Sequence, residues 1–253
     1  MGKEKGTTRE SMIFVFGDSW SAKWQEYNPW PSILESNYGI PTKNFGIAGA
    51  SNGQILDRVS EESINYPNEQ VDLVIVAFTS VDRMTLSITD NVELCVSGDY
   101  QSKSYAHFQK VLFEETDLKS LLFNTWLKLH AIKTIVKATW NCDVIFLPVF
   151  EDCEYWRRRN FKPSLMNICH YKQHSRYFAY DAPVYEVGLM QMDNNIGTEW
   201  CKKYLGNDYE RAYFERTNYC TSSNWFDNSL HPTQAGHDAI ADYFVNDVGI
   251  MDK

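Results

Sequence analysis

A serine stands directly after the first apolar segment of the chain. Residues 12–16 are apolar, and Gly17-Asp18-Ser19-Trp20 follows them at the point where a strand is expected to end and a helix to begin. The amino end of a helix carries free N–H groups and a partial positive charge, which favour a developing negative charge. The position therefore suits a nucleophilic hydroxyl on Ser19, whose own N–H can contribute to an oxyanion hole. The alternative is that Asp18 and Ser19 only cap the helix.

A histidine near the other end of the chain can act as the base for this hydroxyl. His231 belongs to the segment DNSLHP at residues 227–232 and precedes a predicted helix at residues 233–245. A neutral imidazole accepts the proton of an attacking serine and later donates it to the leaving group. A carboxylate shortly upstream, such as Asp227, can orient the ring. These residue types indicate acyl transfer through a covalent intermediate.

A glycine-rich block, NFGIAGAS at residues 44–51, follows a weaker predicted strand. A backbone N–H that stabilises an oxyanion must approach the substrate closely, and a glycine permits that approach because it has no side chain. Gly49 fits this role best, with Gly46 as the second choice. The alternative is an ordinary turn between a strand and a helix.

Along the chain, the serine block comes first, the glycine-rich block second and the histidine block last. In this order the three blocks resemble those of the SGNH/GDSL hydrolases. The resemblance implies a three-layer α/β/α domain with a mainly parallel, flavodoxin-like central sheet. It also implies hydrolysis of a small acyl ester through an acyl-enzyme on Ser19, without a cofactor or a metal. The expected substrate is a small-molecule or carbohydrate ester, such as an O-acetylated sugar, and the expected oxyanion donors are Ser19, Gly49 and a residue after the third strand.

Two positions depart from the family pattern. After the third strand the family has Gly-x-Asn-Asp, whereas residues 78–83 read FTSVDR, so that Ser80 stands at the Asn position and Arg83 follows nearby. The family also places its acid three residues before the histidine, where this chain has Asn228, with Asp227 one position earlier. Asp227 is the preferred partner of the histidine, and a neutral Asn228 is the alternative.

These departures motivate a second hypothesis from a different class of protein. In this alternative the hydrolase scaffold is catalytically impaired and serves as a binding or structural component of a larger assembly, such as a virion. A homo-oligomer is a further partner that the sequence leaves open.

Apolar segments and helical periodicity predict the elements that position these residues. Residues 12–16, 73–78 and 144–149 are continuously apolar, as strands covered on both faces are, and residues 44–47 form the weaker fourth candidate. Residues 118–136 have apolar side chains at steps of three and four, which predicts a long amphipathic helix. We therefore expect one domain over residues 1–253.

An aromatic-rich segment, residues 151–226, has little periodicity and interrupts this alternation of strands and helices. We interpret it as an insertion or lid near the carboxyl ends of the strands, where ligands bind in open α/β sheets. An additional packing layer or an oligomer interface is the alternative.

Charge and composition argue against several classes of partner. The net charge of −9 repels nucleic acid, and the one compact basic run, residues 157–159 with Lys162 nearby, is interpreted as a solvated face. No apolar stretch has the length of a signal core or a membrane span, so a cytoplasmic location without membrane contact is expected. The six cysteines lack paired spacing and are expected to be reduced thiols. Cys169, His170 and His174 lie close together but lack a second ligand pair, so no metal site is predicted.

Overall fold

The structure is a computed structural model. It describes residues 12–23, 26–79, 84–89, 92–96, 118–149, 158–159, 161–165, 168 and 231–252. Ser80, Arg83, Asp227 and Asn228 lie outside these residues, as does nearly all of the predicted insertion.

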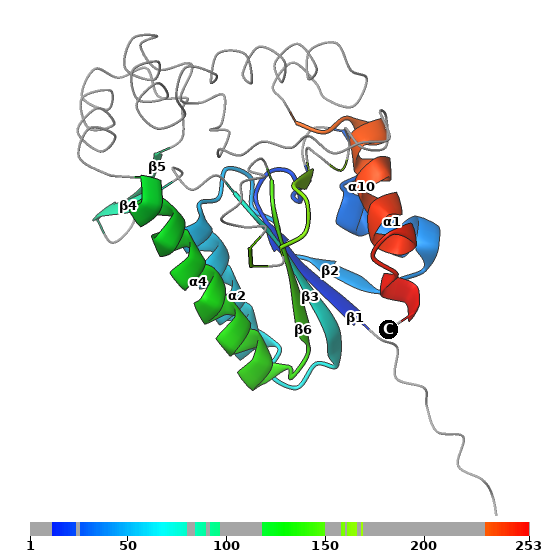
Figure 1. Cartoon of the computed structure of the whole chain (residues 1–253), viewed down its shortest axis with the longest axis horizontal. Coiled ribbons are helices and arrows are strands. Elements are labelled where there is room, and N and C mark those ends of the chain that lie inside the picture. Colours follow the sequence, from blue (N-terminus) through cyan, green and yellow to red (C-terminus); the bar gives the residue numbers. More distant parts are fainter. Residues whose placement is uncertain are drawn as a thin grey trace, which may run out of the picture.

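A parallel sheet of four strands forms the centre of the described part. Its strands are β1 (Met12–Gly17), β2 (Thr42–Asn44), β3 (Val71–Phe78) and β6 (Asp143–Pro148), in the order β2-β1-β3-β6 (Figure 1). The three apolar strands lie close to their predicted positions. The fourth strand occupies residues 42–44, two residues before the predicted start. A separate antiparallel pair, β4 (Met84–Thr89) and β5 (Val92–Val96), was not predicted.

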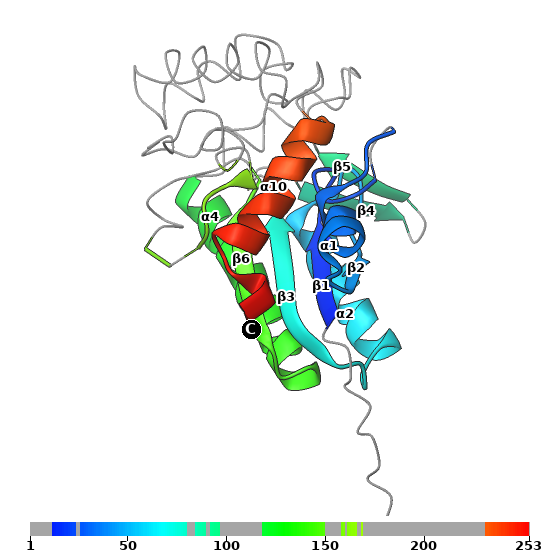
Figure 2. The ribbon, with the colours of Figure 1, turned by 90° about the vertical axis from the view of Figure 1, so that its right-hand side faces the viewer.

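Helices cover both faces of this sheet (Figures 1 and 2). On one face, α2 (Asn52–Asn65) packs beside α4 (Leu118–Thr139). On the other, α1 (Trp30–Tyr38) packs beside α10 (Gln234–Asn246), and a short 3-10 helix, Ile250–Asp252, follows. The predicted three-layer α/β/α fold with a parallel sheet is therefore confirmed. No helix in the described ranges has both the length and the apolarity that a membrane crossing requires.

The two apolar cores explain why β1 contains no polar alternation. Phe14 and Phe16 pack in the cluster beneath α2 and α4, whereas Ile13 and Val15 pack in the cluster beneath α1 and α10. All four side chains are almost completely buried. Burial of successive residues on opposite faces requires an apolar side chain at every position, and it fixes the strand so that its carboxyl end presents residue 18 onward.

Candidate active site

A tight turn, not a helix, follows β1. The N–H groups of Ser21 and Ala22 each donate to the carbonyl oxygen of Asp18 at 3.0 Å, and the Asp18 carboxylate accepts the Trp20 N–H at 3.0 Å. The first helix on this side begins only at Trp30. The expectation of a helix amino end at Ser19, and with it the helix-capping alternative, is therefore wrong. The side chain of Asp18 stabilises the turn that carries Ser19.

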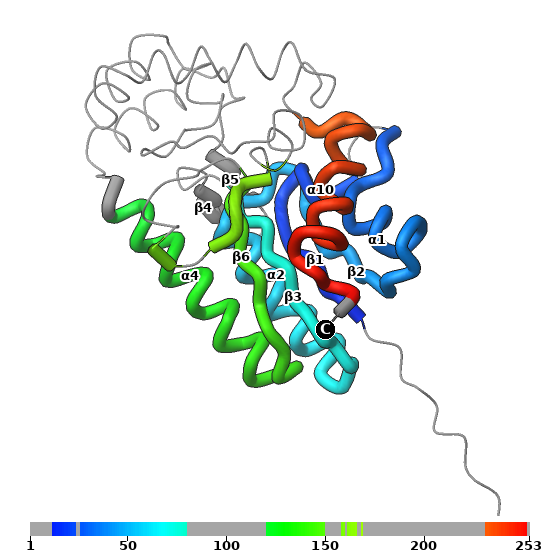
Figure 3. The backbone as a smooth tube through the Cα atoms, turned by 45° about the vertical axis from the view of Figure 1, so that its right-hand side comes forward, coloured from blue at the N-terminus to red at the C-terminus, as the bar shows by residue number. Residues whose placement is uncertain are grey.

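The structure brings Ser19 and His231 together across 212 positions of sequence. The Nε2 atom of His231 lies 2.8 Å from the Oγ atom of Ser19. Ser19 is 5% exposed and His231 is half-buried, so the pair lies at the edge of the protein interior. Figure 3 shows why the two meet: the amino end of α10 lies at the same end of the sheet as the carboxyl end of β1.

Two hydrogen bonds and one aromatic contact hold α10 against α1 and the loop before it. The Asn28 N–H, in the loop before α1, donates to the Gln234 side-chain oxygen at 3.0 Å. Further along, the hydroxyl of Tyr38 donates to the Asp242 carboxylate at 2.7 Å, and this bond raises the pKa of Tyr38 to about 12. Trp30 and Phe244 stack between the same two helices, with ring centroids 4.8 Å apart. These contacts hold the segment that carries His231 against the loop that follows Ser19.

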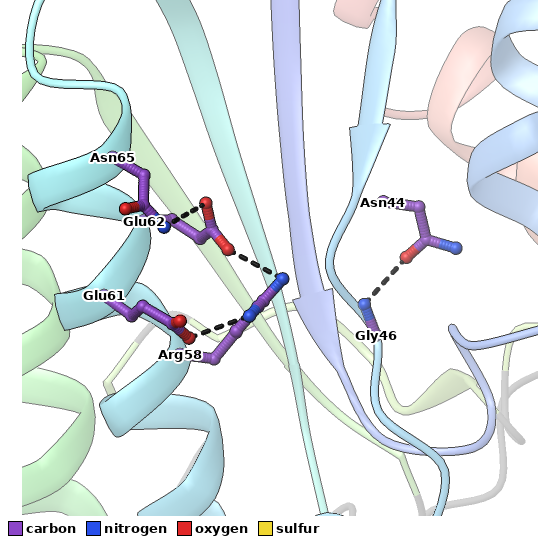
Figure 4. A network of polar contacts seen from close by, with 6 residues as sticks. All are labelled: Asn44, Gly46, Arg58, Glu61, Glu62 and Asn65. Carbon is purple, nitrogen blue, oxygen red and sulfur yellow. Dashed lines mark hydrogen bonds and ion pairs between the residues drawn. The ribbon is translucent and has the colours of Figure 1, made fainter.

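The glycine-rich block contacts the turn that carries Ser19 and stabilises it. The side chain of Asn44 accepts the Gly46 N–H at Oδ1 at 2.9 Å (Figure 4). Its Nδ2 atom donates to the Ser21 carbonyl oxygen at 2.7 Å. A Cβ atom at Gly46 would lie 2.7 Å from the Ala22 nitrogen. A glycine is therefore required at position 46 for close packing of the two backbones. Because its N–H donates to Asn44, Gly46 is a poor second choice as an oxyanion donor.

Gly49 has a different geometry from Gly46. Its φ angle is 76°, in the left-handed region that favours glycine, and among the described residues no atom beyond its chain neighbours lies within 4 Å of the place where a Cβ would stand. The residue lies two positions before Ser51, the N-cap of α2. The backbone conformation alone accounts for a glycine here, and the open space beside it is compatible with a bound substrate.

Asn52 is a positioning residue that the sequence analysis missed. Its buried side chain accepts the Thr79 N–H at 2.9 Å and donates to the Thr79 carbonyl oxygen at 3.0 Å. This pair of bonds ties the amino end of α2 to the end of β3, immediately before Ser80. An Asn directly after the glycine block was the available signal, but nothing in its spacing identified the partner.

A second histidine, His237, lies in the first turn of α10 and is 1% exposed. Neither ring nitrogen has a hydrogen-bond partner among the described residues. Burial, and secondarily the nearby charge of His231, lowers the pKa of His237 to about 4, so its ring is neutral near pH 7. The imidazole that meets the Ser19 hydroxyl is that of His231.

The other predicted site residues lie outside the part of the chain that the structure describes. They are Asp227, Asn228, Ser80, Arg83 and the Cys169, His170, His174 cluster. Within the described ranges, no group of three metal-ligating side chains is close enough to hold an ion. Cys142 is unpaired, and burial raises the pKa of its thiol to about 11, which makes it a poor nucleophile.

Comparison with known proteins gives likenesses in structure only. No protein-family model and no curated protein sequence matches the chain. Among solved structures, a lipolytic protein of the G-D-S-L family from Veillonella parvula DSM 2008 is 11% identical, with 93% of this chain and 96% of that chain covered and a TM-score of 0.42. The esterase EstA from Pseudoalteromonas sp. is 14% identical, with 94% and 96% covered and a TM-score of 0.44. A lipase/acylhydrolase from Enterococcus faecalis is 13% identical, with 94% of both chains covered and a TM-score of 0.40.

The family that the sequence motifs resemble is also represented among these neighbours.

Proposed function

We propose that this chain is a serine hydrolase that cleaves a small acyl ester through an acyl-enzyme on Ser19. The observation that supports this most directly is the 2.8 Å separation between the Ser19 hydroxyl and the His231 imidazole. This distance lies within the range in which a base removes the proton of an attacking hydroxyl. A serine that only stabilised the turn would not require an imidazole from the far end of the chain.

The reaction has two steps. With its ring proton on Nδ1, His231 accepts the Ser19 proton at Nε2 while Oγ attacks the ester carbon, and the resulting imidazolium protonates the departing alkoxide. Water then enters, loses a proton to Nε2 and attacks the acyl-enzyme, which releases the carboxylic acid and restores the hydroxyl of Ser19. No cofactor takes part in this proposal.

The remaining roles are proposals from the sequence. Asp227 orients the His231 ring through Nδ1, with Asn228 as the alternative, and the N–H groups of Ser19 and Gly49 together with Ser80 hold the oxyanion. Two observations favour such an arrangement. Asn52 binds the backbone of Thr79, next to Ser80. The left-handed Gly49 leaves open space beside its Cα. A small acyl group such as acetyl, carried on a carbohydrate, is the proposed substrate.

A fluorophosphonate probe tests the proposal directly, because it forms a covalent bond only with an activated serine. We expect labelling of the wild-type protein, and no labelling or aryl-acetate hydrolysis by Ser19→Ala. His231→Ala should be slowed by at least about 100-fold, the size of effect that loss of a general base gives. Ser36→Ala is the matched control, since Ser36 is exposed on α1 and bonds only Asn37 among the contacts described.

Labelling that persists in Ser19→Ala would place the activated serine elsewhere. Labelling and turnover that are absent from the folded wild-type protein would overturn the proposal and favour the alternative of a binding or structural protein.

A further inference from the structure

The glycine-rich block and the residue that follows it connect the ends of two neighbouring strands. At one end of this segment, residues 44–52, Asn44 donates to the Ser21 carbonyl oxygen at 2.7 Å, in the turn after β1. At the other end, Asn52 contacts the backbone of Thr79, directly after β3. Strands β1 and β3 pair with each other in the sheet. We call residues 44–52 the bridge segment, because they join the carboxyl ends of these two strands.

A turn that contains Gly49 lies in the middle of the bridge segment. The Ile47 N–H donates to the Gly17 carbonyl oxygen at 2.9 Å, and the Ala50 N–H donates to the Ile47 carbonyl oxygen at 3.1 Å. The first bond attaches the turn to the last residue of β1, and the second closes the turn around the left-handed Gly49. Because Ser19 follows Gly17 by two residues, one side of this turn is fixed directly to the strand end that carries the proposed nucleophile.

The other side of the turn leads directly into α2. Ser51, the N-cap of this helix, donates its N–H to the Gln54 side-chain oxygen at 3.0 Å, and its hydroxyl accepts the Gln54 N–H at 3.3 Å. This capping box stabilises the first turn of the helix, so Gly49 precedes a well-defined helix start. The place of the Gly49 turn therefore depends on where the amino end of α2 is held.

Asn52, the first residue of α2, holds that amino end against β3. Its Oδ1 atom accepts the Thr79 N–H at 2.9 Å, and its Nδ2 atom donates to the Thr79 carbonyl oxygen at 3.0 Å. A main-chain N–H only donates and a carbonyl only accepts, so this pair of bonds requires a side chain with both groups. Asn52 is 2% exposed and Thr79 is 0% exposed. Loss of the amide removes the partner of a buried main-chain group, which weakens the attachment of α2 to the sheet.

We propose that Asn52 is a positioning residue of the serine hydrolase. By anchoring the bridge segment to β3, it sets the place of the Gly49 N–H relative to the Ser19 hydroxyl. This role rests on the proposed function, because Asn52 acts only through the position of an oxyanion donor. Such a donor stabilises the transition state most strongly when it is held in place before the reaction begins. Without Asn52, the Gly49 turn keeps its attachment to β1 and loses this attachment to β3.

Steady-state hydrolysis of an aryl acetate by Asn52→Ala and Asn52→Asp tests this role. The concentration of active protein is taken from the final extent of fluorophosphonate labelling, so that each kcat refers to competent serines. Because the lost interaction acts in the transition state, we expect kcat to fall by at least about tenfold in both variants, with KM within about threefold of the wild-type value. Asn52→Asp keeps the shape of the side chain and the acceptor for the Thr79 N–H, but it places an oxygen against the Thr79 carbonyl oxygen.

Val59→Ala is the matched control, because Val59 is fully buried on the same helix and lies outside the bridge segment. Its truncation lowers stability by leaving a cavity in the core, and we expect its kcat to equal that of the wild type. Urea unfolding measures the loss of stability in all three variants. A loss of stability alone is thereby separated from a loss of positioning.

A wild-type kcat in either Asn52 variant would overturn the proposal, and for Asn52→Asp that result would show that side-chain volume is sufficient. An equal fall in kcat for Val59→Ala and Asn52→Ala would also overturn it, since a general loss of stability would then explain the effect. Both results leave the proposed hydrolase intact, because they require an active wild type. Absence of Ser19-dependent turnover in the wild type would instead overturn the hydrolase itself, and with it the role of Asn52.

Discussion

Gly46→Ala should damage the serine site through the backbone alone. A Cβ at this position would lie 2.7 Å from the Ala22 nitrogen and 2.8 Å from the Ser21 carbonyl carbon, whereas ordinary Cβ contacts begin near 3.4 Å. Both neighbours are main-chain atoms, so the turn that carries Ser19 must move by roughly 0.7 Å to relieve the contact. A displacement of about 1 Å at reacting atoms can cost 100-fold in rate, so we expect labelling by a fluorophosphonate to slow by at least about tenfold.

The same substitution should reduce the free energy of unfolding by about 1–3 kcal/mol, the usual cost of overpacking. Gly53→Ala is the matched control, because among the described residues its Cβ would meet only the Ser51 hydroxyl, at 3.5 Å, and the position is helical. That variant should label at the wild-type rate and gain up to about 1 kcal/mol in stability. Urea unfolding and the labelling rate measure both effects. A Gly46→Ala variant that labels as fast as the wild type would refute the view that this glycine sets the position of the turn.

Two further predictions concern buried ionisable groups. The folded-state pKa of His237, about 4, lies below the value of about 6.5 expected on unfolding, so the unfolded chain binds the proton first and stability falls as the pH drops through this window. Between pH 7 and pH 5 the wild type should lose roughly 2 kcal/mol more than His237→Leu in urea unfolding, and an equal loss would contradict the assignment. On α2, Arg58 contacts both Glu61 and Glu62 at 2.7 Å (Figure 4). The Glu61 side chain is 58% exposed, whereas the Glu62 side chain is 3% exposed. Thermal and urea unfolding should therefore show a loss of about 1–3 kcal/mol for Glu62→Gln and under about 0.5 kcal/mol for Glu61→Gln, and similar losses would refute the dependence on burial.

The central strands could be predicted from sequence because burial on both faces leaves a continuous apolar segment. β1 has that property throughout, and β3 and β6 have it after an exposed aspartate near the start of each strand, Asp72 and Asp143. β2 does not, since its three residues, Thr42–Asn44, are polar and only half-buried at the edge of the sheet. Its pairing depends on β1, and two further hydrogen bonds, from Phe45 to Val15 and from Ile47 to Gly17, extend it beyond the strand itself.

The sequence predicted that Ser19 directly follows the first strand, but it did not predict the conformation of the backbone there. Short polar residues after a strand are equally typical of a helix cap and of a tight turn, and here the Asp18 side chain stabilises the turn. The position of α1 depends on the distant packing of Trp30 against Phe244, which no local pattern contains.

The meeting of Ser19 and His231 depends on neighbours that do no chemistry themselves. Asn44 holds the Ser21 carbonyl and so fixes the far side of the serine turn, and Gln234 holds the loop at Asn28 and so fixes the start of α10. Each of these side chains joins two segments through a main-chain atom. Because a displacement of about 1 Å at the reacting atoms can cost 100-fold in rate, we expect these two amide side chains to help position the proposed chemistry. The serine and the histidine come from distant parts of the sequence, and side chains such as Asn44 and Gln234 help to hold the segments that carry them.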